Sequence, residues 1–186
     1  MFDRIYEVNR NCVIGASGDM ADFQFLRDIL KEETTQDSLL DDGFEHSARA
    51  VHSWITRVLY NRRCRFNPLW NVYLVGGLDE NKIPYLGYTN LLGVSFSEDC
   101  VATGFGTHLA LPHLRLVLEK CDGYSNLNES DAVTAITEAM RILYCRDCRA
   151  FNKYSIAVIT EMGVTIQKQV KLEVDWNIAK YVRGYE

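Results

Sequence analysis

The sequence predicts an α+β fold in which helices and sheets form separate layers. Strand and helix patterns follow one another in the order strands, two helices, strands, two helices, strands. Helices that come in adjacent pairs favour a sandwich, with two helices on each side and sheets between, over an alternating βαβ arrangement. At 186 residues and 47% hydrophobic content, the chain is long enough to bury a core within a single domain, 1–186.

The first expected elements are two strands. Residues 4–8 alternate like a strand, and 12–16 begin with an apolar run that is typical of a strand buried on both faces. The polar turn at 9–11 joins them, so we expect a hairpin. Because the chain opens on a strand, that strand needs neighbours to avoid becoming a bare sheet edge.

A two-glycine turn then leads from the sheet to a helix. Gly15 and Gly18 permit a sharp bend, and Asp19 is a good N-cap for a helix over about 19–33. The same strand–turn–helix pattern can cradle a phosphate. However, Asp19 and Asp22 already place two negative charges at the helix start and would repel an anion. A structural turn is therefore favoured over an anion site.

The next segment contains a loop and a second helix. Residues 34–44 are polar and rich in aspartate, which predicts a loop, and the second helix covers about 45–63 before Asn67 and Pro68. Both helices carry an apolar stripe at helical spacing. The stripes are Met20, Phe23, Leu26, Ile29 and Leu30 in the first helix, and Ala48, Val51, Ile55, Val58 and Leu59 in the second.

A block of strands follows the second helix. The apolar segment 70–78 predicts a strand, 79–82 a hairpin loop and 83–88 the returning strand. Residues 93–96 and 101–103 are shorter strand candidates. The chain then returns to helical patterns, so this block is expected to form a sheet next to the opening hairpin.

The second pair of helices is marked by a proline and by capping residues. The third helix begins near Thr107 and has Pro112 in its first turn, where a missing N–H costs little. The fourth helix covers about 129–146 and is capped by Asn128 or Ser130.

The chain ends in a further hairpin and a short helical segment. Residues 154–160 and 164–170 read as strands that are joined by a tight turn at 161–163. Residues 175–182 predict a short final helix that carries Trp176.

Composition excludes several classes of protein. A net charge of −5 and a pI near 5.4 argue against a dedicated nucleic-acid binder, and the basic run at 57–65 is favoured as a solvated or interfacial helix end. No stretch approaches the ~18 apolar residues that span a membrane, and 1–15 contain no signal-peptide core. Six irregularly spaced cysteines fit reduced thiols in the cytosol or nucleus.

Two short motifs resemble functional sites but lack their full patterns. The Gly-Phe-Gly sequence at 104–106 begins like a dinucleotide fingerprint, yet the third glycine position is Leu109, so a strand-to-helix turn is expected. Cys145 and Cys148 have C-x-x-C spacing but lie at a helix C-terminus, where the dipole does not lower a thiol pKa. We therefore expect ordinary cysteines, since no second ligand pair for zinc is present.

The histidines and serines give no convincing reactive site either. His108 and His113 are five residues apart and do not share a helix face, while His46 and His52 lie around the second helix. A satisfied structural role is expected for all four. Ser17 has the wrong glycine spacing for a nucleophile elbow. The sequence thus predicts no catalytic, cofactor-binding or metal-binding residues.

Taken together, several segments resemble the β-type subunits of the proteasome. The likeness covers nearly the whole chain, in order and with suitable spacing, and lies in residues 4–6, 15–22, 87–93, 102–106, 146–147 and 156–164. Other segments are most similar to the seventh β position of the eukaryotic core particle, which is called type 4 in mammalian naming. These are 18–24, 49–54, 67–71 and 143–147.

This resemblance implies the four-layer α/β/β/α sandwich of the N-terminal-nucleophile hydrolases. In that family the first strands would precede Arg4, so they are expected to be missing from this sequence and the domain to be N-terminally incomplete. Without them the sandwich would have an open edge, which predicts a longer natural chain. The family's C-terminal tail reaches toward the facing ring, and here the chain stops at Glu186.

The resemblance also implies that the chemistry is absent. Active members use a free N-terminal threonine as nucleophile and base, supported by an aspartate and a lysine on early strands, and this sequence begins with Met1. The serine of the family's Gly-Ser-Gly turn is Phe105 here. The aspartate after the fourth helix is retained as Asp147, but the serine three residues on is Ala150. The seventh β position is non-catalytic in the family, which agrees.

We therefore expect a non-catalytic structural subunit of the 20S proteasome, needed for β-ring assembly in ubiquitin- and ATP-linked protein degradation. Its partners would be the other α- and β-type subunits of a 28-subunit particle in the cytoplasm and nucleus, with no cofactor, nucleic acid or membrane. Tyr60, Trp70 and Tyr88 could line its contacts or belong to the core. The alternatives are an active threonine-type peptidase whose N-terminal part is missing, and a free-standing α+β binding domain.

Overall fold

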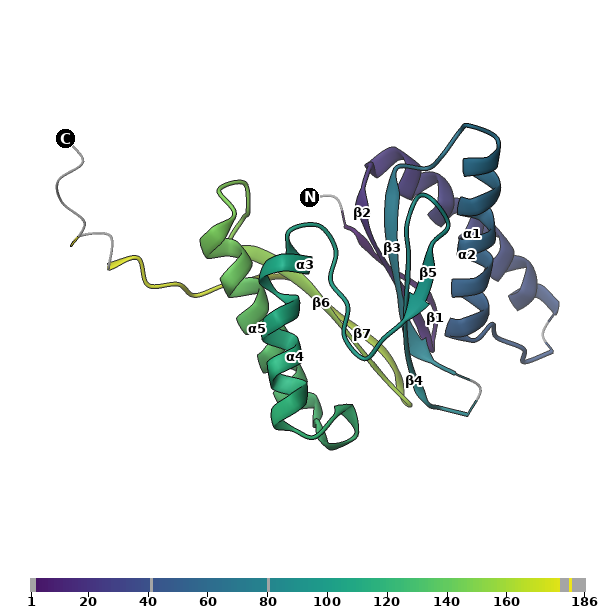
Figure 1. Ribbon diagram of the computed structural model, residues 1–186. Helices are drawn as coiled ribbons and strands as arrows, with labels where there is room; N and C mark the ends of the chain where they lie inside the picture. The colour runs from purple at the N-terminus through teal and green to yellow at the C-terminus, as the bar shows by residue number, and fades with distance from the viewer. Residues whose placement is uncertain (1–2, 41, 80, 178–180, 182–186) are drawn as a thin grey trace.

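An antiparallel hairpin opens the fold and lies at one edge of a larger sheet (Figure 1). β1 (Ile5–Asn9) pairs with β2 (Cys12–Gly18), which confirms the expected hairpin. Cys12, Val13 and Ile14 are all buried, as the apolar run indicates. The computed structural model describes residues 3–40, 42–79, 81–177 and 181, and the statements below concern these residues.

Three further strands complete this sheet. β3 (Asn71–Leu78) pairs with β2, β4 (Pro84–Thr89) with β3, and β5 (Ser95–Ser97) with β4, all antiparallel. Within the described part of the chain the strand order is β1-β2-β3-β4-β5, so each strand pairs with its neighbour in the sequence. Sequential antiparallel pairing of this kind needs only short connections.

The strand expected at 101–103 is wrong. These residues form no strand, because their apolar side chains are used for packing below the helices that follow. Cys100 packs against the buried side chains of Ala110 and Leu114, and Ala102 lies below Gly106. An apolar run of this length cannot by itself distinguish pairing from packing.

Two helices cover one face of the five-stranded sheet (Figure 1). α1 (Met20–Leu40) buries Phe23, Leu26 and Leu30, and α2 (Ala48–Cys64) buries Ala48, Val51, His52, Ile55 and Leu59. Both stripes therefore reach the main core as expected, with Met20 and Val58 packed at its margin. That core also contains Tyr73 and Val75 from the central strand β3.

α1 is longer than expected, so the loop placed at 34–44 is wrong over 34–40. Its last two turns are mostly exposed and polar, and they resemble a loop in composition. Hydroxyl groups in these turns bond to carbonyls four residues earlier: Thr35 Oγ1 donates to the Lys31 carbonyl at 2.6 Å, and Ser38 Oγ donates to the Thr34 carbonyl at 2.8 Å. Such side chains bond back to the preceding turn and remain compatible with a helix.

The expected third helix is divided in two. α3 (Gly106–Leu109) has Ala110 as its C-cap, and α4 (Leu111–Lys120) begins directly afterwards. Pro112 lies in the first turn of α4, as expected, and its ring nitrogen cannot donate to the carbonyl one turn earlier. The chain therefore forms two helices here, and the second begins at Leu111, directly before the proline.

A second, two-stranded sheet and one long helix follow. After the 3₁₀ turn η1 (Tyr124–Asn126), α5 (Glu129–Arg146) has Asn128 as its N-cap, with Oδ1 accepting from the Asp131 N–H at 2.8 Å. β6 (Lys153–Thr160) and β7 (Gly163–Lys171) form the expected hairpin. The expected final helix at 175–182 falls partly outside the described residues.

The two sheets face each other, and each has helices on its outer side (Figure 1). α4 and α5 lie beside the β6–β7 hairpin, on the side opposite to α1 and α2. Ile159 of β6 points toward Gly76 of β3, where a side-chain carbon added to the glycine would lie 3.4 Å from Ile159 Cδ1. Tyr154, Ile156 and Leu172 form a small core below α5. The mixed α/β content and the antiparallel sheets agree with the expected fold class.

Candidate functional site

Phe105 stands where active members of the family that the chain resembles have a serine, and it lies in an exposed turn before α3. Gly104 has a φ of 58° and accepts a hydrogen bond from the Thr107 N–H at 3.2 Å, so the chain turns from a loop into α3. Because no strand precedes the turn, the expected strand-to-helix turn is confirmed only in its helical half. Phe105 is 67% exposed and offers no hydroxyl group for a hydrogen bond.

Asp147, the retained aspartate, is used within its own loop. It lies at the C-terminal end of α5, where its Oδ1 accepts from the Arg149 N–H at 2.9 Å. Its carbonyl accepts from the Ala150 N–H at 3.1 Å. The methyl group of Ala150 cannot donate or accept a proton. This carboxylate therefore stabilises a turn, and the two positions together provide no nucleophile.

The turn that carries Phe105 lies close to the end of α5 that precedes Asp147. A side-chain carbon placed on Gly106 would lie 3.9 Å from Leu143 Cδ1, one turn before Asp147. The structure thus brings the two family positions to neighbouring elements. The groups found there are an exposed phenyl ring and a carboxylate that caps a turn, which do not form a reactive pair.

The cysteines are free thiols that differ in burial. Cys145 and Cys148 are exposed free thiols, and Cys12 is fully buried in β2. Burial raises the pKa of Cys12 to about 12, so its thiol remains protonated and unreactive near neutral pH. Among the described residues, no group of three or more histidine, cysteine, aspartate or glutamate side chains is arranged to hold a metal ion.

The histidines differ from one another. His52 is buried and fully bonded, and His46 lies 3.0 Å from Asp37, so both have structural partners as expected. For His113 the expectation of a satisfied role is wrong, because its Nε2 is buried without a hydrogen-bond partner. His108 is exposed on α3.

Two aspartates at the start of α1 form hydrogen bonds that cap the helix and connect it to the segment before β3. Asp19 Oδ1 accepts from the Ala21 and Asp22 N–H groups at 2.9 and 3.0 Å, which confirms the N-cap and occupies the donors that an anion would need. The sequence missed a second bond: Asp22 Oδ2 accepts from the Trp70 N–H at 2.8 Å. This bond connects α1 to the segment before β3, a partner that is 48 residues away in the chain and has no local sequence pattern.

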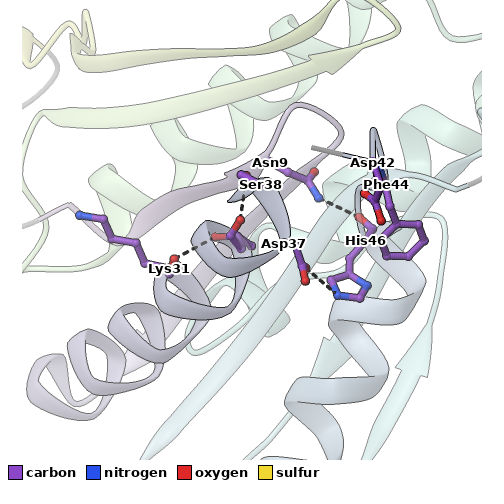
Figure 2. Close-up of polar contacts among 8 residues, drawn as sticks. Asn9, Lys31, Asp37, Ser38, Asp42, Phe44 and His46 are labelled. Carbon is purple, nitrogen blue, oxygen red and sulfur yellow. Dashed lines mark hydrogen bonds and ion pairs between the residues drawn. The ribbon is translucent and has the colours of Figure 1, made fainter. Parts of the chain in front are cut away.

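A second polar cluster holds the connection between α1 and α2 (Figure 2). Asn9 Nδ2 donates to the His46 carbonyl at 2.8 Å, and the His46 ring meets both Asp37 at 3.0 Å and Phe44 edge-on at 5.0 Å between centroids. Nearby, Arg10 lies 3.9 Å from Glu45. These contacts surround a cavity of about 510 Å³ and dock the loop on the β1–β2 turn. The cluster is therefore explained by folding.

Aromatic side chains at the surface form the more distinctive feature. Tyr60 and Trp70, which could have belonged to the core, are 53% and 65% exposed. Tyr88 is half-buried and stacks on Phe96 with ring centroids 4.6 Å apart. The sequence did not single out other exposed apolar residues, which include Phe25, Phe66, Leu92, Val94 and Phe96. Exposed aromatic groups of this kind are typical of protein–protein interfaces.

No described helix has the length and hydropathy that a bilayer crossing requires.

Known proteins match the chain over most of its length. Residues 1–159 match the family described as proteasome subunit. The chain is 41% identical over 183 residues to proteasome subunit beta type-4 of Xenopus laevis, covering 98% of this chain and 74% of that protein.

Relatives from plants and fungi show the same similarity. The chain is 41% identical to proteasome subunit beta type-4 of Arabidopsis thaliana, over 96% of this chain and 70% of that protein. It is 38% identical to proteasome subunit beta type-7 of Saccharomyces cerevisiae, over 98% of this chain and 71% of that protein. The motifs that suggested the resemblance are therefore part of a likeness along almost the entire chain. The chain belongs to the proteasome β-subunit family.

Proposed function

We propose that this chain is a non-catalytic structural subunit of the proteasome 20S core particle. The observation that carries this proposal is the similarity, over nearly the whole chain, to subunits named beta type-4 and beta type-7. In this role the chain fills one position in the β ring and contacts neighbouring α- and β-type subunits. It thereby supports ubiquitin- and ATP-linked protein degradation in the cytoplasm and nucleus.

The same proposal includes the architecture and the extent of the domain. Residues 1–186 form one β-type domain with the four-layer α/β/β/α sandwich of the N-terminal-nucleophile hydrolases. Support comes from the two facing sheets and from the helices outside each (Figure 1). Ile159 bridges the sheets by packing toward Gly76.

We also propose that the chain has no catalytic, cofactor-binding or metal-binding residue. Phe105 and Ala150 replace the two hydroxyl groups of the active family members, and Asp147 caps its own turn. An active peptidase subunit is the second candidate, since Asp147 is retained. The chemistry of Phe105 and Ala150 favours the non-catalytic subunit, because neither side chain can transfer a proton.

The test follows an epitope-tagged version of the chain in cell extract. Native electrophoresis should place the tag in a particle far larger than 21.3 kDa, together with the other subunits and with peptidase activity. A covalent inhibitor that reacts with N-terminal threonine should label other subunits in that particle and leave this chain unlabelled. A tag that migrates as a free species of one-subunit mass would contradict the assembly role, and labelling of this chain would support the active peptidase.

A further inference from the structure

A shallow groove follows one flank of α2, and three of the residues that line it are arginines. Its volume is about 350 Å³, and its walls come from one helix and the residue that caps its end. The lining residues, which we call the α2 groove, are Trp54, Arg57, Val58, Asn61, Arg62 and Arg65. The basic run that the sequence placed at an interfacial or solvated helix end therefore forms a defined surface.

The positive charges of the α2 groove are not neutralised within the described part of the chain. Arg57, Arg62 and Arg65 form no ion pair there, whereas Arg27 and Arg141 pair with carboxylates at 2.7 Å. This concentration of positive charge is unusual for a chain with a net charge of −5. Arginine near a helix C-terminus also interacts favourably with the helix dipole. That effect is confined to the last turn and does not extend to Arg57.

The floor and one margin of the groove are apolar. Trp54 and Val58 are half-buried and pack against the main core, so they form a fixed surface. Arg62 lies over the ring of Phe25, with its Cζ 4.9 Å from the ring centroid, and this contact holds its guanidinium group at the groove. The surface thus combines oriented guanidinium groups with exposed apolar area, and both are enriched at protein interfaces.

The length of the groove favours an extended ligand. At 1.5 Å per residue, Trp54 and Arg65 are separated by about 16 Å along the helix axis, which equals about five residues of extended chain. A single phosphate could meet only part of this row of charges. A nucleic acid is disfavoured because the basic surface is confined to three arginines, whereas nucleic-acid binders usually carry an extended basic patch and a high pI.

We infer that the α2 groove binds an acidic segment of an adjacent protein subunit, with carboxylates on Arg57, Arg62 and Arg65 and an apolar side chain on Trp54 and Val58. This inference rests on the proposed function, because it takes the partner from the same particle. Carboxylates pair with guanidinium groups through two parallel hydrogen bonds, which fixes the register of the segment. The arginines therefore determine which neighbour is accepted.

One experiment uses a defined probe. A short fluorescein-labelled peptide of alternating glutamate and leucine is titrated against the purified chain and followed by fluorescence anisotropy. The double variant Arg57→Glu and Arg62→Glu should weaken binding by at least about tenfold. Arg63→Glu is the matched control, because Arg63 is on the same helix end, lies 5.7 Å from the Tyr60 ring centroid and does not line the groove.

The Arg63→Glu control distinguishes binding in the α2 groove from general electrostatic attraction. An equal loss of binding in the double variant and in Arg63→Glu would overturn the inference, as would tighter binding of a fluorescein-labelled oligonucleotide at the same residues. Circular dichroism should show unchanged helix content in both variants. The double variant Arg57→Lys and Arg62→Lys retains the positive charge. It should keep more of the affinity for the peptide than the glutamate double variant, which would show that the loss of binding is not due to misfolding.

A second experiment identifies the partner in the assembled particle. The chain carries the photoreactive substitution Asn61→benzoylphenylalanine, and the cross-linked peptide is sequenced by mass spectrometry. A segment rich in aspartate and glutamate supports the inference, and a segment without them overturns it. If the unmodified chain enters the particle and the double glutamate variant enters equally well, the inference fails while the proposed function stands. If the unmodified chain does not enter the particle, the proposed function itself fails.

Discussion

The imidazole of His52 joins α2 to the sheet by hydrogen bonds from both ring nitrogens. Its Nδ1 lies 2.6 Å from the phenolic oxygen of Tyr85, and its Nε2 lies 3.0 Å from the Tyr88 carbonyl and 2.7 Å from Thr89 Oγ1. Because a carbonyl only accepts, we assign the ring proton to Nε2, which leaves Nδ1 to accept from Tyr85. Burial lowers the pKa of His52, which favours the neutral imidazole in the folded state.

Stability should therefore fall when His52 is protonated. Burial lowers the pKa of His52 below the ordinary 6.5, so the unfolded state binds the proton more readily than the folded state. The stabilisation is fully present above pH 6.5 and is lost as the pH falls from 6.5 through the lower folded pKa. Urea unfolding at a series of pH values should show this slope, and His52→Gln should reduce it. His46→Gln serves as the control and should leave the His52 contribution in place.

Gly77 should tolerate no side chain, in contrast to its neighbour on β3. A methyl group there would lie 2.2 Å from the Asn11 carbonyl oxygen and 2.6 Å from Ala48 Cβ. Gly77→Ala should therefore reduce the free energy of unfolding by at least about 2 kcal/mol. The control is Gly76→Ala, whose methyl would meet only the flexible ends of Ile159 and Leu86, at 3.4 and 4.0 Å, and should cost less than about 1 kcal/mol. Equal losses for the two variants, measured by urea unfolding, would contradict this account of the packing.

Asp22 should stabilise the joint between α1 and β3. Its carboxylate accepts from the Trp70 N–H at 2.8 Å, and Asp22→Ala removes this bond together with a favourable charge at the helix start. The expected loss is about 1 kcal/mol in urea unfolding. Asp28→Ala is the comparison, because that carboxylate forms an exposed pair with Arg27 and should change stability by less than about 0.5 kcal/mol. If the Asp28 variant loses as much, the bond to Trp70 is not the cause.

Replacing Asn71 by aspartate, which has the same shape but can carry a charge, should destabilise the fold. Its buried amide donates to the carbonyls of Ser17 and Asp19 at 3.1 and 2.6 Å. Asn71→Asp would place a carboxylate oxygen against these acceptors, with an expected loss of about 3 kcal/mol when it is ionised. The loss should shrink as the pH is lowered, because a protonated carboxyl group can donate. Gln36→Glu, which changes an exposed amide on α1 to a carboxylate, should show no such dependence.

Much of the fold could be predicted from the sequence. The β1–β2 hairpin, the apolar stripes of α1 and α2, the β6–β7 hairpin and the Asn128 cap are confirmed. Each of these depends on residues close together in the chain: a period of two or of 3.6, a turn, or a capping side chain. The family positions at Phe105, Asp147 and Ala150 were also visible, because the identity of a residue settles whether it can transfer a proton.

The errors have two sources: a composition that fits more than one local structure, and contacts with residues distant in the chain. The end of α1 resembles a loop by composition, yet hydroxyl groups bond back into the helix. The segment 101–103 resembles a strand, yet its neighbours pack below α3 and α4. The unsatisfied Nε2 of His113 depends on what surrounds it, which no local pattern describes.

The sequence by itself determined most of the order of the elements, the family, and the side chains Phe105 and Ala150, which carry no hydroxyl group. Only the tertiary structure decided which of Tyr60, Trp70 and Tyr88 reaches solvent and which polar groups meet across the fold. It also decided that three arginines share one groove on α2. The physical reason is that periodicity and residue chemistry are local, whereas burial and charge neutralisation depend on segments brought together from distant parts of the chain.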